Sequence, residues 1–332
     1  MKIYKSLEEF YSKGNSIVTI GTFDGVHVGH QKILNSLKEM AIKYDGETVL
    51  LTFYPHPRLI INPDDQHLKL LSDIEEKVGA LADAGVDHLI IMPFTRDFSN
   101  QSPEEYIRNV LIRKLGVRCI VIGYDHRFGK DRKGSIRDLR QQGKIYGFDV
   151  KEISEQDVEE VAVSSTKIRE ALIVGDIETA NKYLGYPFEL TGKVIEGDKI
   201  GRDLGFPTAN LEVHEKHKLI PAYGIYAVEA QVFDGLSPIE SGEYESPEII
   251  EKFQAMAYIG NRPTVDGVHR TIEVNFLDFS GNLYNKTLRI RFLDFIRHDE
   301  RFESMEILIK KMKEDEKKIR AFFENKNTAS SF

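Results

Sequence analysis

The 332-residue chain has few of the features that mark secreted, disulfide-bonded or membrane proteins. Its one cysteine, Cys119, excludes an intramolecular disulfide framework and a Cys-based zinc site. No apolar run approaches the ~20 residues that a membrane-spanning helix needs. Residues 1–10 mix Lys and Glu with single apolar residues, so we expect no secretory signal. These absences predict a soluble, cytoplasmic protein without a membrane partner.

Basic residues are fewer than acidic residues. The chain has 45 Lys and Arg against 53 Asp and Glu, which gives a net charge of −8. An acidic chain is a poor candidate for non-specific binding to nucleic acid or anionic lipid, so we expect no nucleic-acid partner. Hydrophobic residues make up 41% and charged residues 30%, as in ordinary globular proteins, and the length predicts about two domains. The sequence leaves the oligomeric state open.

The first half of the chain alternates short apolar segments with helical patterns. The segments are rich in Val, Ile, Leu and Phe, like parallel strands that are buried on both faces. They span residues 16–23, 47–54, 87–94 and 118–124. An apolar stripe predicts a helix over residues 30–44, and capping patterns predict helices that open at Ser72 and Ser102. This alternation predicts an α/β fold with a doubly wound parallel sheet.

The pattern changes after about residue 185, where strand signals recur without regular helices between them. They span residues 189–194, 224–233, 254–259, 271–278 and 287–293. Gly, Pro and Asn separate them, which predicts a small antiparallel β-barrel. We expect a closing helix over residues 304–323, a frayed end over residues 325–332, and a hydrated acidic loop over residues 234–252. The predicted domains are residues 1–185 and 186–332.

The first chemical motif is GTFDGVHVGH, residues 21–30, which follows a predicted strand and opens a helix. A glycine-rich turn at this place brings backbone N–H groups and a helix N-terminus close to a phosphate. His27 and His30 are three residues apart, so both rings can donate to the charge that builds on a transferring phosphoryl group. The turn is neither a Walker A loop nor Gly-x-Gly-x-x-Gly. A His-x-x-His metal pair and two solvated histidines at a helix cap are the alternatives.

Two further segments carry groups that suit phosphate. VSSTKIR, residues 163–169, opens a helix with hydroxyls and an arginine, which makes a second anion site. In GKVIEGDKIGRDLGFPTANL, residues 192–211, the glycines at 197, 201 and 205 form a mobile loop able to wrap a polyphosphate. Thr208 and Asn210 lie two apart, so on a strand both point to one face and can ligate Mg²⁺. For this pair alone, a turn with two satisfied polar side chains is the favoured alternative.

These motifs resemble a known family. Gly-x-Phe-Asp-Gly-x-His-x-Gly-His with Ser-Ser-Thr-x-Ile-Arg resembles the nucleotidylyltransferase superfamily, and more narrowly the adenylyltransferase half of bacterial bifunctional riboflavin kinase/FMN adenylyltransferases, also called FAD synthetases. Gly-Arg-x-Leu-Gly-Phe-Pro-Thr-Ala-Asn-Leu resembles the riboflavin kinase signature. Shorter matches lie at residues 53–57, 93–95, 123–129, 259–264, 273–279 and 297–304. The resemblance covers residues 15–320.

The resemblance implies two ATP-dependent steps with Mg²⁺ as the metal. The C-terminal domain phosphorylates riboflavin to FMN, and the N-terminal domain transfers AMP to FMN, which gives FAD and pyrophosphate. In the N-terminal domain, His27 and His30 are the implied catalytic residues. The implied ATP-binding residues there are Gly21, Thr22, Phe23, Asp24, Gly29, Ser165, Thr166 and Arg169. The implied flavin-binding residues there are Phe53, Pro55, His56, Pro57, Asp125 and Phe128.

In the C-terminal domain, the resemblance makes Glu273 the general base on the ribityl hydroxyl, although without the family a rim carboxylate is the favoured interpretation. The implied ATP-binding residues there are Gly192, Lys193, Gly197, Gly201, Thr208 and Asn210, of which the last two bind the metal. Arg297 and Arg301 are the implied flavin-binding residues.

The chain departs from the family at three positions. Ala162 stands where some members have arginine, Tyr258 where asparagine is common and Asn275 where histidine is common. The alternatives to a bifunctional enzyme are a riboflavin kinase with a degenerate N-terminal domain, a flavin-binding sensor that has lost turnover, and an enzyme with another acceptor in its N-terminal half.

Overall fold

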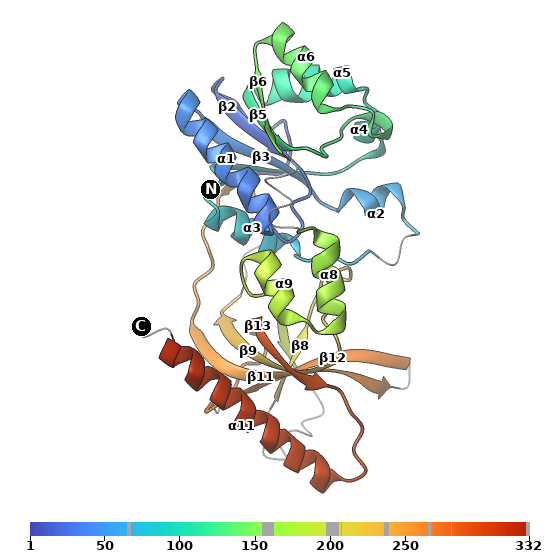
Figure 1. Cartoon of the computed structure of the whole chain (residues 1–332), viewed down its shortest axis with the longest axis vertical. Helices are drawn as coiled ribbons and strands as arrows, with labels where there is room; N and C mark the ends of the chain where they lie inside the picture. The colour runs from blue at the N-terminus through green and yellow to red at the C-terminus, as the bar shows by residue number, and fades with distance from the viewer. Residues whose placement is uncertain are drawn as a thin grey trace. The chain divides into compact units, whose positions relative to one another are not determined.

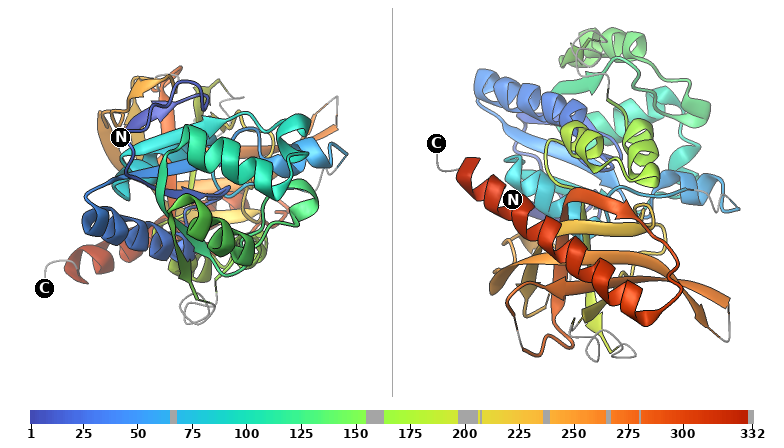
Figure 2. Two further views of the ribbon diagram at one scale, coloured as in Figure 1. Left: turned by 90° about the horizontal axis from the view of Figure 1, so that it is seen from above. Right: turned by 60° about the horizontal axis from the view of Figure 1, so that its bottom comes forward.

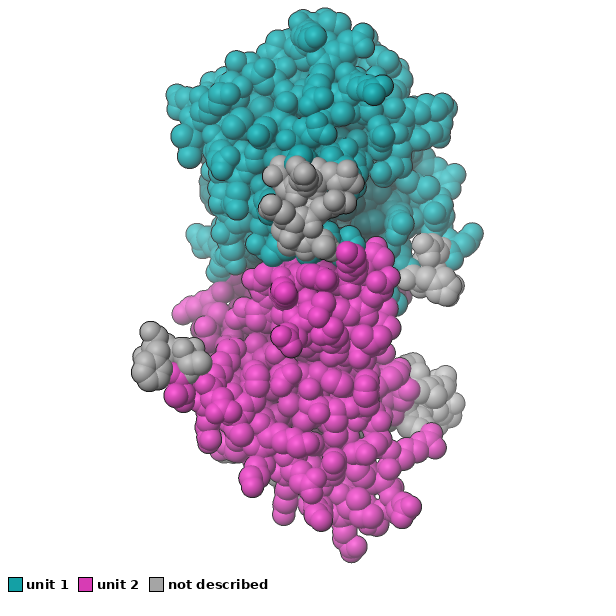
Figure 3. All heavy atoms as spheres, viewed as in Figure 1, with its two compact units in different colours: residues 1–165, 238–246 teal, residues 166–237, 247–332 magenta. Residues whose placement is uncertain are grey.

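The computed structural model describes residues 1–64, 68–154, 163–196, 206, 208–235, 239–264, 267–279 and 281–329. It divides the chain into two compact units (Figure 3). The first unit holds Met1–Ser165 and Pro238–Ser246, and the second holds Thr166–Ser237 and Pro247–Phe332. The chain therefore passes between the units three times. The boundary predicted between the two functional domains, at residues 185 and 186, stays a prediction.

The first unit is built on a seven-stranded sheet with the order β10-β1-β4-β3-β2-β5-β6. Strands β2, β3, β5 and β6 can be followed in Figure 1. Its strands are β1 (Lys2–Tyr4), β2 (Ser16–Ile20), β3 (Glu47–Phe53), β4 (His88–Met92), β5 (Val117–Gly123), β6 (Asp149–Ile153) and β10 (Gly242–Glu243). All pairs are parallel except β1 with β10. The four strands expected from the apolar runs are present, whereas β1, β6 and β10 were not foreseen.

Helices cover both faces of this sheet, so the doubly wound α/β prediction is confirmed. The helical elements are α1 (Val28–Tyr44), α2 (Pro57–Ile61), α3 (Ile74–Asp83), α4 (Arg96–Ser99), α5 (Pro103–Tyr106), the π-helix η1 (Ile107–Lys114), the 3₁₀-helix η2 (Lys130–Arg132) and α6 (Ile136–Tyr146). One core packs α1 and α3 on Ile17, Leu50 and Leu89. The other packs η1 and α6 on residues next to these in the same strands, which face the opposite way.

The acidic segment expected to be a hydrated loop contributes to the first sheet instead. Gly242 and Glu243 form β10, which pairs antiparallel with β1. Tyr244 packs against the α1/α3 core, and its N–H donates to the carbonyl of Met1 at 2.8 Å. Ser241 donates to the carboxylate of Glu9 at 2.6 Å. The expectation was wrong for residues 242–244, because Gly242 and Glu243 pair through their backbones and Tyr244 packs on the core, while the side chain of Glu243 stays exposed.

Helix starts agree with the capping patterns, with one shift. Ser102 caps α5 and forms the expected box with Glu105. The box at α3, however, joins Asp73 and Glu76, one residue after the pair that begins with Ser72. Ser72 does not cap α3, because its hydroxyl instead accepts the N–H of Gly25 at 3.1 Å. Gly25 lies 47 positions earlier in the chain.

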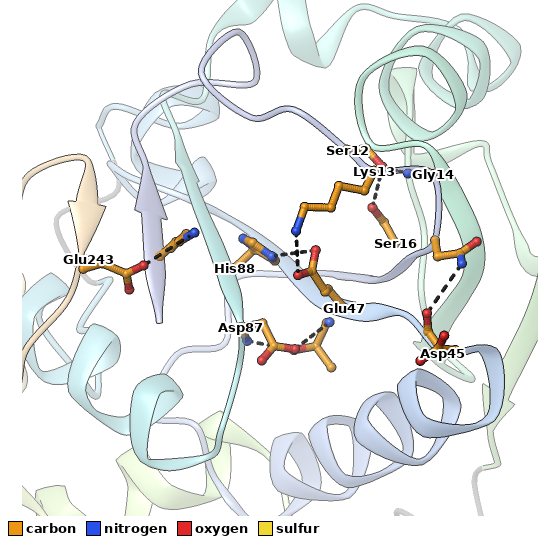
Figure 4. Close-up of polar contacts among 12 residues, drawn as sticks. Ser12, Lys13, Gly14, Ser16, Asp45, Glu47, Asp87, His88 and Glu243 are labelled. Atoms are coloured by element: carbon orange, nitrogen blue, oxygen red, sulfur yellow. Dashed lines mark hydrogen bonds and ion pairs between the residues drawn. The ribbon is translucent and has the colours of Figure 1, made fainter.

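A polar cluster fixes the amino ends of the central strands (Figure 4). The carboxylate of Asp87 accepts both the N–H and the hydroxyl of Thr48, at 2.9 and 2.8 Å. The Glu47 carboxylate lies 3.3 Å from His88 and 3.4 Å from Lys13. Ligands of open α/β sheets bind at the carboxyl ends of the strands. This cluster therefore connects the strands at the opposite end from the one where ligands bind.

The second unit holds a closed antiparallel barrel with the order β11-β12-β8-β7-β13-β9, as predicted. Its strands are β7 (Glu189–Ile195), β8 (Thr208–Glu212), β9 (Gly224–Phe233), β11 (Glu251–Thr264), β12 (Gly267–Phe276) and β13 (Thr287–His298). Its helices are α8 (Ser165–Val174), whose first residue Ser165 belongs to the first unit, α9 (Ile177–Leu184) and α11 (Met305–Ala329).

The closing helix α11 lies across the outside of the barrel (Figure 2). Ile319 and Phe323 pack there with Ile225, Ala227 and Met256. The helix continues to Ala329, so the expected fraying from residue 325 was wrong for the part of this end that is described. Among the described residues, no helix is long and apolar enough to cross a membrane.

Candidate active sites

The order of the first sheet reverses between β2 and β5. Strands β2, β3 and β4 succeed one another in one direction, and β5 and β6 extend the other way. In such sheets ligands bind in the crevice outside the carboxyl ends at the reversal. The loops that leave β2 and β5 there are residues 21–27 and 124–129, which contain the first motif and the aromatic GYDHRFG segment. The fold therefore brings two of the predicted site segments to one edge.

The loop after β2 has a backbone that few sequences permit. Phe23, Gly25 and Val26 all have positive φ, at 46°, 80° and 35°. Asp24 is 3% exposed, and one of its carboxylate oxygens accepts the N–H groups of Leu71 and Ser72 at 2.9 and 3.2 Å. These bonds hold a strained turn in place, as phosphate-binding loops require. Asp24 thus has an architectural role beside its predicted one toward ATP.

The two histidines of the motif are brought together at the start of α1. His27 is the N-cap, and its Nδ1 accepts the backbone N–H of His30 at 3.4 Å. The bond leaves the Nε2 of His27 as the nitrogen that carries the proton in the neutral ring. The rings stack with centroids 3.7 Å apart. Burial, followed by the nearby His27 and Lys77, holds the pKa of His30 well below its usual value, so His30 is neutral at neutral pH.

The second segment, residues 163–169, begins beside the loop that follows β2. Ser165 begins α8, and its hydroxyl donates to the carbonyl of Asp24 at 3.2 Å; both residues belong to the first unit. Thr166 and Arg169 follow in the first turns of α8 and belong to the second unit. Their roles toward ATP stay predictions. Ala162 lies outside the described residues.

Lys77 of α3 is a candidate residue that the sequence did not single out. Its side chain is buried beside the loop, where burial lowers its pKa while Asp24 and Asp73 act in the opposite direction. It also contributes to lowering the pKa of His30. The sequence signal was weak, because a lysine on a predicted helix normally lies in solvent.

The predicted flavin residues of the first unit join one aromatic cluster. Phe53 ends β3 and contacts Phe94 and Phe98 with ring centroids at 5.2 and 5.5 Å. Phe98 contacts Tyr106, which contacts Phe128 at 5.2 Å. Phe53 and Phe128 are nearly buried, and their contacts with flavin stay predictions.

The remaining predicted flavin residues are more accessible. Pro55 and Asp125 are exposed, while His56 caps α2 by accepting the N–H of Arg58 at 3.2 Å and Pro57 opens that helix. Their contacts with flavin stay predictions. His126 was missed: burial lowers its pKa to about 4, and its Nε2 has no hydrogen-bond partner within the described residues. An unsatisfied buried nitrogen is typical of a functional site.

The barrel brings the predicted kinase residues onto one face. Glu273 of β12 lies opposite Asn210 of β8, and Asn275 lies opposite Thr208. The hydroxyl of Thr208 donates to the Glu273 carboxylate at 3.2 Å. The alternation expected for Thr208 and Asn210 is therefore present, and it adjoins the proposed base.

Of the glycines predicted to bind ATP in the barrel, the structure describes Gly192. Gly192 lies in β7, where a β-carbon would overlap the carbonyl oxygen of Glu212 on β8. Glycine is therefore required there by strand packing, whatever its contact with ATP. Lys193 is exposed in the same strand. Gly197 and Gly201 lie outside the described residues.

Arg297, predicted to bind flavin, pairs with one buried and one exposed carboxylate. Its guanidinium lies 2.8 Å from the carboxylate of Asp315, which is fully buried on α11, and 3.2 Å from Glu300. Asp315 was missed by the sequence analysis because it falls on a helix rich in charge. Arg301 lies in the exposed turn before α11. Direct contacts of Arg297 and Arg301 with flavin stay predictions.

The donor set in the barrel fits a nucleotide-bound magnesium ion. Thr208 and Asn210 offer a hydroxyl and an amide oxygen, which are the hard ligands that Mg²⁺ prefers. No group of three or more His, Cys, Asp and Glu suited to a metal occurs in the part of the chain that the structure describes. Two neutral oxygens suit an ion that keeps substrate phosphates and waters in its shell.

Taken together, the two sites define a two-domain, nucleotide-dependent transferase. One site combines a strained glycine loop with a histidine pair on a doubly wound sheet, and the other combines a carboxylate with hard oxygen donors on a small barrel. The FAD synthetase family model matches residues 10–167, and the riboflavin kinase family model matches residues 184–323. The chain belongs to the family of bifunctional riboflavin kinase/FMN adenylyltransferases.

Curated relatives and a solved structure match most of the chain. The bifunctional riboflavin kinase/FMN adenylyltransferase of Listeria monocytogenes is 37% identical, and the match covers 93% of each chain. That of Escherichia coli K12 is 34% identical over 92% of each. A structure described as a macrolide-efflux protein from Streptococcus pneumoniae has a TM-score of 0.83 and 29% identity, over 96% of this chain and 98% of that one.

Proposed function

We propose that this protein converts riboflavin to FAD in two ATP-dependent steps. In the barrel, the γ-phosphoryl group of ATP moves to the ribityl hydroxyl of riboflavin, which gives FMN and ADP. On the doubly wound sheet, the FMN phosphate attacks the α-phosphorus of a second ATP, which gives FAD and releases pyrophosphate. The observation that carries this proposal is the presence of both domain families, in order, in one chain.

The geometry of the first unit supports the adenylyl step without a covalent enzyme intermediate. An in-line attack needs donors fixed around the α-phosphate. The neutral ring of His27 has its Nδ1 engaged by the backbone, so its Nε2–H is the group that can donate. We assign the same kind of role to His30, and we assign Arg169 to the developing negative charge.

The geometry of the barrel supports general-base catalysis by Glu273. A carboxylate can accept the proton of the ribityl hydroxyl as the phosphoryl group transfers. The hydroxyl of Thr208 donates to Glu273, which orients that carboxylate. We assign Mg²⁺ to Thr208 and Asn210; when bound, it neutralises charge on the ATP phosphates. The choice of Mg²⁺ rests on the preference of this ion for oxygen ligands such as those of Thr208 and Asn210.

Separation of flavins after incubation tests the proposal. Purified protein is given riboflavin, ATP and Mg²⁺, and in a parallel reaction FMN and ATP. We expect FMN and then FAD in the first reaction and FAD in the second. FMN without FAD in both reactions would favour a riboflavin kinase with a degenerate N-terminal domain, and flavin binding without products would favour a sensor. Omitting the metal, or replacing it with Mn²⁺, tests the metal assignment.

The proposal also covers partners and location. Riboflavin, FMN and ATP are the proposed small-molecule partners, without nucleic acid or membrane. A synthesis that consumes two ATP molecules for each FAD supports a place in the cytoplasm, where ATP is made. Fractionation of cells that produce the protein tests this directly.

A further inference from the structure

The turn between β13 and α11, residues 299–304, is held to the barrel by a hydrogen bond from a neighbouring strand. The phenol of Tyr258, in β11, donates to a carboxylate oxygen of Asp299 at 3.2 Å. The two residues are 41 positions apart, so this bond joins β11 to the start of the turn, where the N–H of Asp299 also donates to the carbonyl of Tyr223 at 3.4 Å. The turn also carries Arg301.

Tyr258 lies next to the proposed base. In the ladder between β11 and β12 its direct partner is Glu273. Side chains of directly paired residues project from the same face of a sheet with β-carbons about 5 Å apart. The same tyrosine is therefore adjacent to the base at one end and bonded to the turn at the other.

The position of the ring is determined by its surroundings. A β-carbon on Gly260 would overlap the phenol, so the ring lies flat along the strand over a residue without a side chain. Its other contacts are with the apolar cluster beneath α11. Packing over Gly260 and against this cluster restricts the ring, which favours the orientation in which its hydroxyl meets Asp299.

The phenol acts as a donor and not as a base. Burial and then the carboxylate of Asp299 raise the pKa of Tyr258 to about 12, with a smaller contribution from Glu273. It remains protonated at neutral pH, and a protonated hydroxyl beside two carboxylates can donate to either.

A second set of contacts holds the same turn from the other side. Arg297 bonds to buried Asp315 of α11 and to Glu300 of the turn, and its guanidinium lies over the Phe302 ring at 5.6 Å. These contacts anchor the turn to α11, and the bond from Tyr258 holds the side chain of Asp299 on the side of β11, next to the proposed base.

We propose that Tyr258 is a positioning residue of the kinase step, which holds the 299–304 turn against the site beside Glu273 so that riboflavin binds with its hydroxyl at the base. This inference rests on the proposed function. It predicts that loss of the hydroxyl affects flavin binding more than the chemical step.

The test uses the full-length enzyme with riboflavin, ATP and Mg²⁺. Tyr258→Phe keeps the ring and removes the donor. Losing a hydrogen bond to a charged group should raise the KM for riboflavin by roughly 10-fold, with a smaller change in kcat. Asp299→Ala should give a similar shift, whereas Asp299→Asn, which keeps an acceptor oxygen, should stay within roughly 2-fold of the parent.

The double variant Tyr258→Phe/Asp299→Ala distinguishes a direct bond from general damage. If the bond is the cause, the double variant should resemble either single variant and not their product. Tyr284→Phe, an exposed tyrosine in the same unit, is the matched control and should leave the KM unchanged. FAD formation from supplied FMN should be normal in all of them.

Several results would overturn the inference. An unchanged riboflavin KM in Tyr258→Phe would do so, as would shifts that multiply in the double variant or an equal shift in Tyr284→Phe. A fall in thermal midpoint with loss of both activities would also contradict it, because that would show a structural role. If the parent enzyme phosphorylates no riboflavin, the proposed function itself fails.

Discussion

The imidazole rings of His27 and His30 stack with their centroids 3.7 Å apart. Two imidazolium ions at this distance would repel each other, and the burial of His30 disfavours its charged form further. His30 therefore stays neutral, and the stacked pair is not expected to carry two positive charges at the start of α1.

Removing either ring should stop FAD formation and spare FMN formation. We expect His27→Ala or His30→Ala to slow adenylyl transfer by ~10²–10³, the usual effect of losing a donor to a reacting phosphate. The measurement is FAD formed from supplied FMN and ATP, beside FMN formed from riboflavin. His214→Ala, an exposed histidine of the second unit, serves as control. Equal loss of both activities would contradict two separate sites.

The kinase step should depend on Glu273 and on the hydroxyl next to it. Glu273→Gln should slow riboflavin phosphorylation by ~10²–10⁴ while riboflavin still binds. Thr208→Ala removes both a proposed metal ligand and the bond to Glu273. We expect it to raise the magnesium concentration needed for half-maximal rate and to lower the rate at saturation, whereas Asn210→Ala should mainly change the former. Near-normal phosphorylation by Glu273→Gln would exclude its role as base.

Gly192 offers a way to separate packing from nucleotide binding. Because a β-carbon there would overlap the carbonyl of Glu212, Gly192→Ala should destabilise the barrel by about 1–3 kcal/mol. Thermal unfolding monitored together with the KM for ATP is the measurement. A raised KM for ATP with an unchanged midpoint would show that the glycine serves the nucleotide and that the strands adjust.

An isolated barrel fragment should be more stable when it includes α8 and α9 than when it lacks them. Asn181 of α9 donates to the carbonyl of Phe292 at 2.8 Å and accepts the N–H of Phe188 at 2.7 Å. A fragment of residues 166–332 should therefore unfold at a temperature higher than a fragment of residues 186–332, by roughly 5 °C or more. Equal midpoints would show that α9 adds nothing to the barrel. Both fragments should still make FMN and no FAD.

Acid should destabilise the protein in part through His126. Its pKa is about 4 in the folded state, below the usual value near 6.5, so the unfolded chain binds the extra proton first. Stability should be complete above about pH 6.5 and should fall as the pH drops toward 4. Thermal midpoints across this range should decline less steeply in His126→Gln than in the parent, with His214→Gln as the exposed control. Parallel curves would refute the assignment.

Strong local patterns explain which parts of the fold the sequence predicts. Continuous apolar runs identified β2 to β5, and Ser102 with Glu105 identified the start of α5. The edge strand β6 was missed because its residues are mostly polar and half exposed. At α3, two overlapping capping pairs satisfied the same pattern, and the contact between Ser72 and Gly25 selected the later one.

The residues of the candidate sites also fall into those that the sequence predicts and those that it does not. Motif residues such as His27 and Glu273 were found because their types and spacing are distinctive. Lys77, Asp315 and the bond between Tyr258 and Asp299 depend on which surface packs on which, and sequence spacing does not carry that information. Residues that support others are therefore the ones that needed the structure.

The origin of β10 has a consequence for how the protein is made. Ribosomes deliver a chain from its N-terminus, and domains generally fold in that order. Strand β1 is among the first segments to emerge, yet its partner β10 follows more than 230 residues later, after much of the barrel has been synthesised. The first sheet therefore keeps an unfinished edge for most of translation, and an unpaired edge is a place where nascent chains associate wrongly. A stalled or truncated chain that ends before Gly242 would carry this edge permanently.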